Sequence, residues 1–333
     1  MTAATYDVLG IGNAIVDILA KTEDRFLTEQ GMAKGSMALI DEARAAAIYD
    51  AMGPATEISG GSAANTIAGI ANLGARAAFV GKVRNDQLGN VFSHDIRAAG
   101  VAFDTQAASN GPATARCYVL VSPDGERTMN TYLGAAQDLS PADIDPAQIA
   151  ASSIVYLEGY LWDPANAKEA FIKASKIAHE NKRSVALTLS DAFCVGRYRD
   201  EFLDLIRSKT VDLIFANEAE LTSLYQTEDF DKALTQLRSD ATLAVVTRSE
   251  KGCVVVAKDK VTPVPASPIK QMVDTTGAGD LFAAGFLFGL VRGLNHEQCG
   301  QFGALAAAEV IQHIGARPQA SLQDLAKAAG LPV

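Results

Sequence analysis

The sequence predicts an α/β protein, built on a doubly wound, mostly parallel sheet flanked by helices, with a small β-sheet projecting from it. Two observations predict the main sheet. Apolar β-type runs alternate with helical patterns along most of the 333 residues, and several runs are near-continuously apolar, as strands buried on both faces require. A third observation predicts the projecting sheet, because the β-type segments 31–41 and 112–134 have no partnering helices.

The main sheet is expected to take its strands from seven runs along the chain, at residues 6–12, 77–83, 153–160, 184–190, 212–217, 243–249 and 252–257. Helical stretches such as 65–74 and 164–182 lie between these runs. Such alternation favours a sheet that binds ligands at the carboxyl ends of its strands. The sequence has no internal repeat and no linker rich in Pro, Gly or Ser, so residues 1–333 are expected to form a single domain.

The projecting sheet is expected to come from two inserted segments, at about 13–41 and 100–134. Within the second segment, SPDGER (122–127) separates two β-type runs and therefore predicts the turn of a hairpin. A small sheet of this kind is expected to cover a site as a lid. A lid matters where a reaction must exclude water.

Composition and charge exclude several classes of function. With 48% hydrophobic and 20% charged residues, the chain can bury an ample core. Its formal net charge of -10 argues against a nucleic-acid or anionic-membrane partner, because both need clustered Lys and Arg. A small phosphate compound can still bind locally, through backbone N–H groups and one or two basic side chains.

The sequence predicts a cytoplasmic protein. Its start has no basic segment followed by a long apolar run, so no signal peptide is expected, and it holds no run of 18 apolar residues. The four cysteines are scattered without a C-x-x-C pair, which favours reduced thiols over disulfides or a zinc site.

The stretch DTTGAGDLFAAGFLFGL, from Asp274 to Leu290, places a turn of small residues before a strongly apolar helix. Gly277, Ala278 and Gly279 are expected to expose consecutive backbone N–H groups at the helix N-terminus, where the helix dipole favours a phosphate. Asp280 is then close enough to accept a proton from an attacking hydroxyl. Alternatively, Asp280 only complements the helix dipole, as first-turn acids often do.

Two common nucleotide-binding motifs do not match the chain. VGKV (80–83) lacks the first glycine and the final Ser or Thr of a Walker A loop. GIGNAIVDI (10–18) has Ile15 where a dinucleotide fingerprint needs its third glycine. Any use of ATP must therefore depend on a different phosphate-binding loop.

Two long motifs, in order, resemble the signatures of the ribokinase-like carbohydrate and nucleoside kinases, the PfkB family. The first is GGSAANTIAGIANLGARAAFVGKVRNDQLGNVF (60–92), the second is DTTGAGDLFAAGFLFGL, and the resemblance covers nearly the whole chain. It implies a ribokinase-like fold that uses ATP and Mg²⁺. It also implies that Asp280 is the catalytic base and that the backbone of Gly277, Ala278 and Gly279 forms an anion hole.

The resemblance assigns the acceptor site to two glycine-containing stretches. Asp17 is implied to bind two adjacent hydroxyls of the acceptor sugar, with Asn13 beside it, because both oxygens of a carboxylate accept hydrogen bonds. Gly60 and Gly61 are implied to lie against the sugar, and Asn65 to bind a hydroxyl. Without the resemblance, GGSAAN (60–65) is only a tight turn before a helix.

The nucleotide site is implied by three later segments. Asn217 and Glu220 in FANEAEL are expected to organise the magnesium and phosphate network, with Glu220 acting through water. Thr247 and Gly252 are expected to line the nucleotide, and the small residues Gly303 and Ala307 to leave room for a flat base. Asp274 and Thr276 match positions that hold a monovalent cation, K⁺, in many members.

Within the family, the resemblance is strongest to members of the adenosine kinase type. It rests on GNAIVDI, GGSAANTIA, GERTMNTYLGA and HIGARP. Arg127 matches a basic lid residue suited to charge near the transferred phosphate, and otherwise is a surface arginine of a hairpin. Met37 and Tyr132 are expected to stack on a purine, or else to pack the small sheet on the main domain.

Three functions remain open from the sequence. The first is an ATP-dependent kinase of purine salvage that phosphorylates the 5′-hydroxyl of a nucleoside, with adenosine the leading acceptor. The second is a kinase of the same family acting on a free sugar such as ribose or fructose. The third is a nucleoside or nucleotide sensor without turnover, against which the intact Asp280 argues. Either a monomer or a homodimer formed through the lid fits the sequence.

Overall fold

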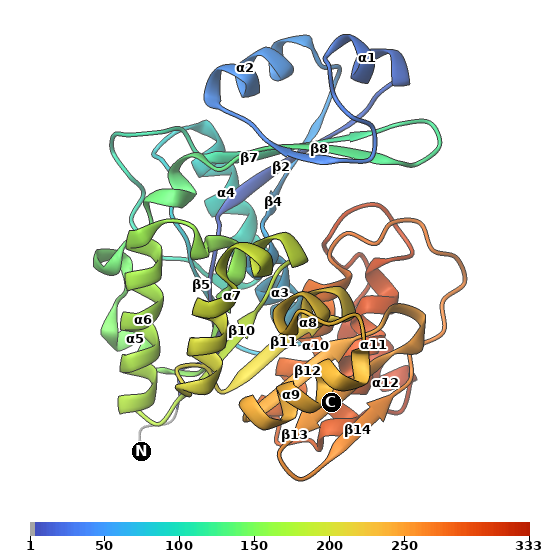
Figure 1. Cartoon of the computed structure of the whole chain (residues 1–333). Coiled ribbons are helices and arrows are strands. Elements are labelled where there is room, and N and C mark those ends of the chain that lie inside the picture. Colours follow the sequence, from blue (N-terminus) through green and yellow to red (C-terminus); the bar gives the residue numbers. More distant parts are fainter. Residues whose placement is uncertain (1–3) are drawn as a thin grey trace.

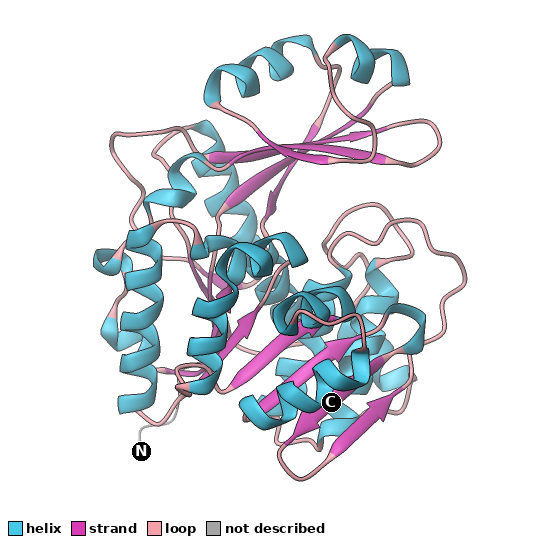
Figure 2. Cartoon of the chain, viewed as in Figure 1, coloured by secondary structure: helices cyan, strands magenta, loops and turns pink. Residues whose placement is uncertain are grey.

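Two β-sheets organise the computed structural model of the protein, which describes residues 4–333 (Figures 1 and 2). The larger sheet has the strand order β14-β13-β12-β11-β10-β9-β1-β5-β6. Its strands run parallel from β6 to β12, while β13 and β14 are antiparallel. Its strands are β1 (Tyr6–Ile11), β5 (Ala77–Val80), β6 (Val101–Ala102), β9 (Ser152–Glu158), β10 (Ser184–Thr188), β11 (Leu213–Asn217), β12 (Leu243–Thr247), β13 (Cys253–Ala257) and β14 (Val261–Val264).

Helices cover both faces of the larger sheet, as the alternating sequence pattern predicts. Successive strand residues point to opposite faces, so Val8 of β1 packs into one apolar core and Leu9 into another. The first core is shared with α3 (Ser62–Asn72), α4 (Gln87–Ala98), α10 (Ala278–Val291), α11 (His296–Val310) and α12 (Leu322–Ala328). The second is shared with α5 (Pro146–Ala150), α6 (Ala165–Glu180), α7 (Ala192–Arg207), α8 (Glu218–Tyr225) and α9 (Phe230–Asp240).

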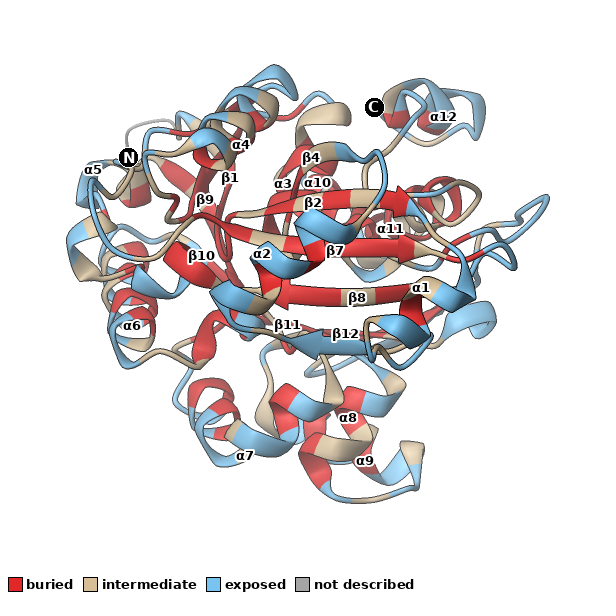
Figure 3. Ribbon diagram, turned by 90° about the horizontal axis from the view of Figure 1, so that it is seen from above, coloured by how far each residue is buried: buried red, intermediate tan, exposed pale blue. Residues whose placement is uncertain are grey.

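The smaller sheet projects from the main body and carries two helices on its outer side (Figures 1 and 3). Its strand order is β3-β8-β7-β2-β4. The strands are β2 (Ile15–Lys21), β3 (Met37–Leu39), β4 (Thr56–Gly60), β7 (Ala115–Val121) and β8 (Arg127–Tyr132), and the helices are α1 (Asp24–Glu29) and α2 (Glu42–Ala51). β7 and β8 form the antiparallel hairpin that the turn at 122–127 predicts.

The boundaries of the smaller sheet differ from those expected in two respects. Residues 56–60, placed outside the lid by the sequence pattern, form its edge strand β4. Residues 101–102, placed inside it, form β6 and pair with β5 in the larger sheet. The expected extent 1–333 also includes residues 1–3, which lie outside the described residues.

The glycines inside the apolar helix α10 allow close contact with α11. A Cβ on Gly285 would lie 2.3 Å from the backbone oxygen of Phe302, and a Cβ on Gly289 would lie 2.9 Å from Cα of Cys299. Both distances are too short for any side chain, so the two helices could not pack this closely without glycine. The helix that begins at the GAGD turn is therefore packed closely against α11.

None of the helices in the described part of the chain is both long enough and apolar enough to cross a membrane. The four cysteines are buried and free, as their scattered spacing predicts.

Candidate active site

A large cavity opens between the smaller sheet and the main body. Its volume is about 1880 Å³, whereas a site for one small ligand usually occupies about 300–1000 Å³. Strands of the smaller sheet line one side, and the carboxyl ends of β9 to β12, the N-terminus of α10 and the loop after α11 line the other. The cavity therefore has room for two small molecules bound side by side.

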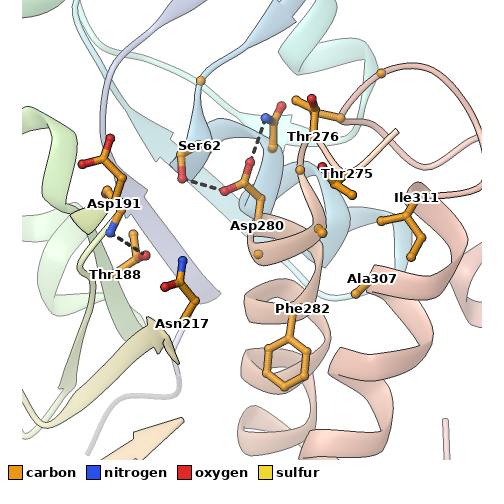
Figure 4. A pocket seen from close by; sticks show the side chains of 18 of the residues that line it. Ser62, Thr188, Asp191, Asn217, Thr275, Thr276, Asp280, Phe282, Ala307 and Ile311 are labelled. Atoms are coloured by element: carbon orange, nitrogen blue, oxygen red, sulfur yellow. Dashed lines mark hydrogen bonds between the residues drawn. The ribbon is translucent and has the colours of Figure 1, made fainter. Parts of the chain in front are cut away.

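Asp280 lies in the first turn of α10 and faces this cavity (Figure 4). Its Oδ1 accepts a hydrogen bond from the Ser62 hydroxyl at 2.6 Å, and its Oδ2 accepts one from the Asn65 amide at 3.0 Å. Burial raises the pKa of Asp280 above its usual range, and these two hydrogen bonds partly offset that rise. The carboxylate is thus fixed in orientation and made more basic than one in water.

The GAG turn leads directly into α10. Gly277 is the N-cap and has a φ of +78°, in the left-handed region that favours glycine. Gly277, Ala278 and Gly279 all line the cavity. The Ala278 N–H donates to the Thr275 carbonyl oxygen at 3.2 Å, so Gly277 and Gly279 are the residues of the turn whose N–H groups are best placed for a ligand. This is a suitable place for a phosphate or a developing negative charge.

Asp17 on β2 lies against Gly60, at the end of β4, and Gly61 follows as the N-cap of α3. Asp17 lines the cavity, and burial raises its pKa to about 7, with Arg317 and Arg127 opposing the rise. A Cβ on Gly60 would lie 2.3 Å from Oδ2 of Asp17, and one on Gly61, whose φ is +99°, would lie 2.3 Å from the carbonyl oxygen of Asn13. Gly60 itself does not line the cavity in the described chain; it makes room for the Asp17 carboxylate.

Glu158, at the end of β9, organises this part of the site and was not predicted from the sequence. It is 1% exposed; its Oε1 accepts from the Asn13 amide at 2.6 Å and its Oε2 from the Ala63 backbone N–H at 2.8 Å. Burial raises its pKa to about 7, against the effect of these hydrogen bonds. Glu158 therefore fixes Asn13 and the first turn of α3.

The predicted nucleotide-binding residues lie together at the other end of the cavity, with one exception. Asn217 and Glu220 form a reciprocal capping box at the start of α8, in which the Glu220 carboxylate accepts from the Asn217 backbone N–H at 3.1 Å and from its amide at 2.5 Å. Burial raises the pKa of Glu220 to about 7. Thr247, Gly252 and Ala307 also line the cavity.

The exception is Gly303, which lies between helices and not in the cavity. A Cβ at Gly303 would lie 2.8 Å from the backbone oxygen of Phe282, so its small size serves the packing of α11 on α10.

Tyr132, expected to stack on the acceptor, is also displaced from its expected place. Its hydroxyl donates to the Glu42 carboxylate at 3.1 Å, and Tyr132 does not line the cavity in the described chain, whereas Met37 does.

The side chains expected to hold a monovalent cation, those of Asp274 and Thr276, contact an arginine side chain. The guanidinium of Arg127 forms an ion pair with the Asp274 carboxylate and donates to the Thr276 hydroxyl at 3.0 Å. Asp274 also accepts from the backbone N–H groups of Thr276 and Gly315, each at 3.0 Å. The Arg127 cation thus lies beside the carboxylate that was expected to hold K⁺, and monovalent-cation binding at Asp274 and Thr276 stays a prediction.

Two cavity residues lie in motifs that the sequence analysis quoted but were not selected individually, Ser62 within GGSAAN and Arg317 within HIGARP. A third, Glu158, is an acid at the end of the apolar strand expected at 153–160. An acid at that position is a usable signal, since parallel strands place functional groups at their carboxyl ends. Among the described residues, no group of three or more His, Cys, Asp or Glu side chains is arranged to hold a metal ion.

The arrangement can remove a proton from a hydroxyl and stabilise negative charge beside it. Asp280 supplies the acceptor for the proton, and the N-terminus of α10 supplies positive potential a few residues away. The cavity allows a hydroxyl-bearing molecule near Asp17 and a phosphate donor near Glu220 to meet at Asp280. These features are those of a phosphoryl-transfer site.

Comparisons with known proteins identify the family of the chain. The profile described as pfkB family carbohydrate kinase matches residues 49–323. The structure of adenosine kinase from Sinorhizobium meliloti is 56% identical, with a TM-score of 0.92, over 98% of this chain and all of that one. The structure of a probable sugar kinase protein from Rhizobium etli is 52% identical, with a TM-score of 0.93, over 99% of this chain and all of that one. Adenosine kinase 2 of Arabidopsis thaliana is 29% identical over 94% of this chain and 96% of its own length.

Proposed function

The chain belongs to the pfkB family of carbohydrate kinases, and from this premise we propose that it transfers the γ-phosphoryl group of ATP to the 5′-hydroxyl of adenosine. Family membership makes it an ATP-dependent kinase. The observation that carries the proposal is the position of Asp280, fixed by Ser62 and Asn65 at a helix N-terminus in a cavity with room for both substrates.

In the proposed transfer, the bond between the γ-phosphorus of ATP and its bridging oxygen breaks, and a bond from the 5′-oxygen to the γ-phosphorus forms. Asp280 accepts the proton of the attacking hydroxyl, and ADP leaves with the bridging oxygen. The N–H groups of the GAG turn stabilise the charge on the three γ-phosphoryl oxygens. Asp17 orients the acceptor through its ribose hydroxyls.

The residues near the expected triphosphate fit a magnesium ion held largely through water. Mg²⁺ usually keeps several waters and binds one or two carboxylates together with substrate phosphates. Glu220 and Asp191 both line this end of the cavity, and the charge of Asp191 contributes to the raised pKa of Glu220. These two carboxylates are the groups that would hold the waters of a magnesium ion. When bound, the ion neutralises phosphate charge.

The acceptor end of the cavity favours a nucleoside over a free sugar. The inner face of the smaller sheet, and Leu133 directly after β8, present apolar side chains there; those of the sheet come from Leu19, Met37, Leu39, Val119 and Met129. A purine base offers a flat apolar surface to such a face, while a free sugar has mainly hydroxyls. The similarity to the Sinorhizobium meliloti adenosine kinase supports the same acceptor.

A sugar kinase is the second candidate, favoured by the name of the 52% identical Rhizobium etli protein. It keeps Asp280 and the GAG turn in the same roles and changes only the acceptor. The two are separated by measuring ADP release with Mg·ATP on adenosine, inosine, guanosine, ribose and fructose, followed by identification of the phosphorylated product. We expect AMP from adenosine at the highest kcat/KM, and a higher value for ribose or fructose would overturn the nucleoside assignment.

A further inference from the structure

Arg317 connects the loop after α11 to the edge strand of the smaller sheet. Its Nη2 donates to the carbonyl oxygen of Ser59 at 2.9 Å and to the Ser59 hydroxyl at 3.0 Å. Ser59 is 0% exposed and directly precedes Gly60 and Gly61. The backbone N–H of Ser59 in turn donates to the Asp95 carboxylate on α4 at 2.7 Å. Arg317 thus holds, through Ser59, the strand against which the Asp17 carboxylate lies.

The charges of three carboxylates, those of Asp17, Asp95 and Asp280, act on the Arg317 guanidinium, and Arg317, Asp17 and Asp280 line the same cavity. Burial lowers the pKa of Arg317 to about 10, and these three charges oppose that shift, so the side chain remains protonated at neutral pH. Its Nε is buried without a hydrogen-bond partner among the described residues. The structure therefore retains a partly buried cation that desolvation alone disfavours.

The positive charge of Arg317 acts on both carboxylates that face the acceptor. It opposes the rise in pKa that burial causes at Asp17 and at Asp280. One other cation, Arg127, also lowers the pKa of Asp17, but its guanidinium forms an ion pair with Asp274. At Asp280 it is the cation that lowers the pKa.

We propose that Arg317 is a positioning residue of the transfer site, which holds Asp17 and Asp280 in their charged forms and fixes the Ser59–Gly61 floor beneath the acceptor. The inference rests on the proposed function, since it assigns the two carboxylates their acceptor-binding and proton-accepting roles. It predicts that the charge of Arg317 determines how far the pH can fall before activity is lost.

Other groups also act on these carboxylates and are the same in every variant tested. Those that interact with Asp280 are Ser62 and Asn65 on α3, Tyr156 and Glu158 on β9, Tyr160 after β9, and Asp17 on β2. Those that interact with Asp17 besides Arg317 are Arg127 on β8, Cys117 on β7 and Asp280. Apart from Arg127 and Arg317, the charged side chains among these residues are carboxylates. Removing the charge of Arg317 therefore makes the surroundings of Asp17 and Asp280 more negative.

The test compares Arg317→Met, Arg317→Lys and a control, Arg199→Met, in the full chain. Arg199 also donates to a backbone carbonyl, that of Leu224, at 2.8 Å, and it does not line the cavity in the described residues. The measurement is kcat/KM for the acceptor from pH 5.5 to 9, with the unfolding temperature of each variant. Wild-type turnover in the same assay tests the proposed function separately, and an inactive wild type would overturn both.

We expect Arg317→Met to move the acidic limb of the profile to higher pH by about one unit, which corresponds to about a tenfold loss in the ionised fraction on that limb. At pH 9 its loss should be smaller. Arg317→Lys retains the charge and should keep the wild-type limb. Equal losses for Arg317→Met at every pH, or identical profiles for the Lys and Met variants, would show a purely structural role. If Arg317→Met does not fold, Arg317→Gln replaces it in the same comparison.

Discussion

Replacing Gly277 by alanine tests whether the GAG turn depends on its backbone conformation and on close contact with the loop after α11. The φ of +78° costs a side-chain-bearing residue about 1–2 kcal/mol. The new Cβ would also lie 2.8 Å from both Cα and Cβ of Ala316, where ordinary contacts are longer, and such overpacking costs about 1–3 kcal/mol. The two effects together should destabilise the protein by about 2–5 kcal/mol.

Two other glycines separate these effects. Gly293 has a φ of +73° with nothing within 4 Å of an added Cβ, so Gly293→Ala should show the backbone cost of about 1–2 kcal/mol alone. Gly279 lies in α10, also has nothing within 4 Å and has no positive φ, so Gly279→Ala should gain up to about 1 kcal/mol from helix propensity.

Thermal unfolding measures the differences, and phosphoryl transfer measures their consequence. An unfolding entropy of about 2.1 cal/mol/K per residue, over 333 residues, means that each kcal/mol lowers Tm by about 1.4 °C. Gly277→Ala should therefore lower Tm by about 3–7 °C, and a displaced anion-binding turn should reduce kcat by about 100-fold. A Gly277→Ala protein that unfolds like Gly293→Ala and retains wild-type kcat would refute the reasoning.

Three further perturbations test the charged groups of the site. Asp280→Asn should lower kcat by about 10²–10⁴-fold, while calorimetry finds ATP and acceptor binding within a few-fold of wild type; undiminished turnover excludes Asp280 as the base. Asp17 and Asp280 must both be ionised for transfer, and burial raises the pKa of Asp17 to about 7 and also raises that of Asp280. We therefore expect kcat/KM to fall as the pH falls through about 7. A flat profile from pH 5 to 9 contradicts this expectation. The folded-state pKa of Glu158, raised to about 7, lies above its unfolded value, so the folded protein binds more protons and loses stability as the pH rises toward 7. Glu158→Gln should therefore weaken the decrease in the free energy of unfolding between pH 5 and 8, measured by urea titration, and an equal decrease in both proteins counts against a buried, titrating Glu158.

Much of the fold could be predicted because its determinants are local. Parallel strands buried on both faces need apolar runs such as the one from Tyr6 to Gly12, and helices between them show their own periodicity. The GAG turn and Asp280 are contiguous, so their proximity follows from the sequence alone. The hairpin around 122–127 was likewise predictable from its turn residues.

The remainder depends on contacts between residues far apart in the chain. Residues 56–60 lead directly into α3, and only their pairing with β2 places them in the smaller sheet. Arg317 and Ser59 are separated by 258 residues, and Glu158 and Asn13 by 145, so no local pattern indicates either pair. Tyr132 lies on a strand whose neighbouring residues point to opposite faces, and its contact with Glu42 settles which face it takes.

The central claim is that this chain phosphorylates a nucleoside with Asp280 as the base. It is tested most directly by ADP release with Mg·ATP on adenosine, ribose and fructose, for the wild type and Asp280→Asn in parallel. We predict turnover of adenosine to AMP by the wild type, a much lower kcat/KM for the two sugars, and loss of adenosine turnover in Asp280→Asn. Turnover of a free sugar in preference to adenosine, or adenosine turnover that survives in Asp280→Asn, would contradict the claim.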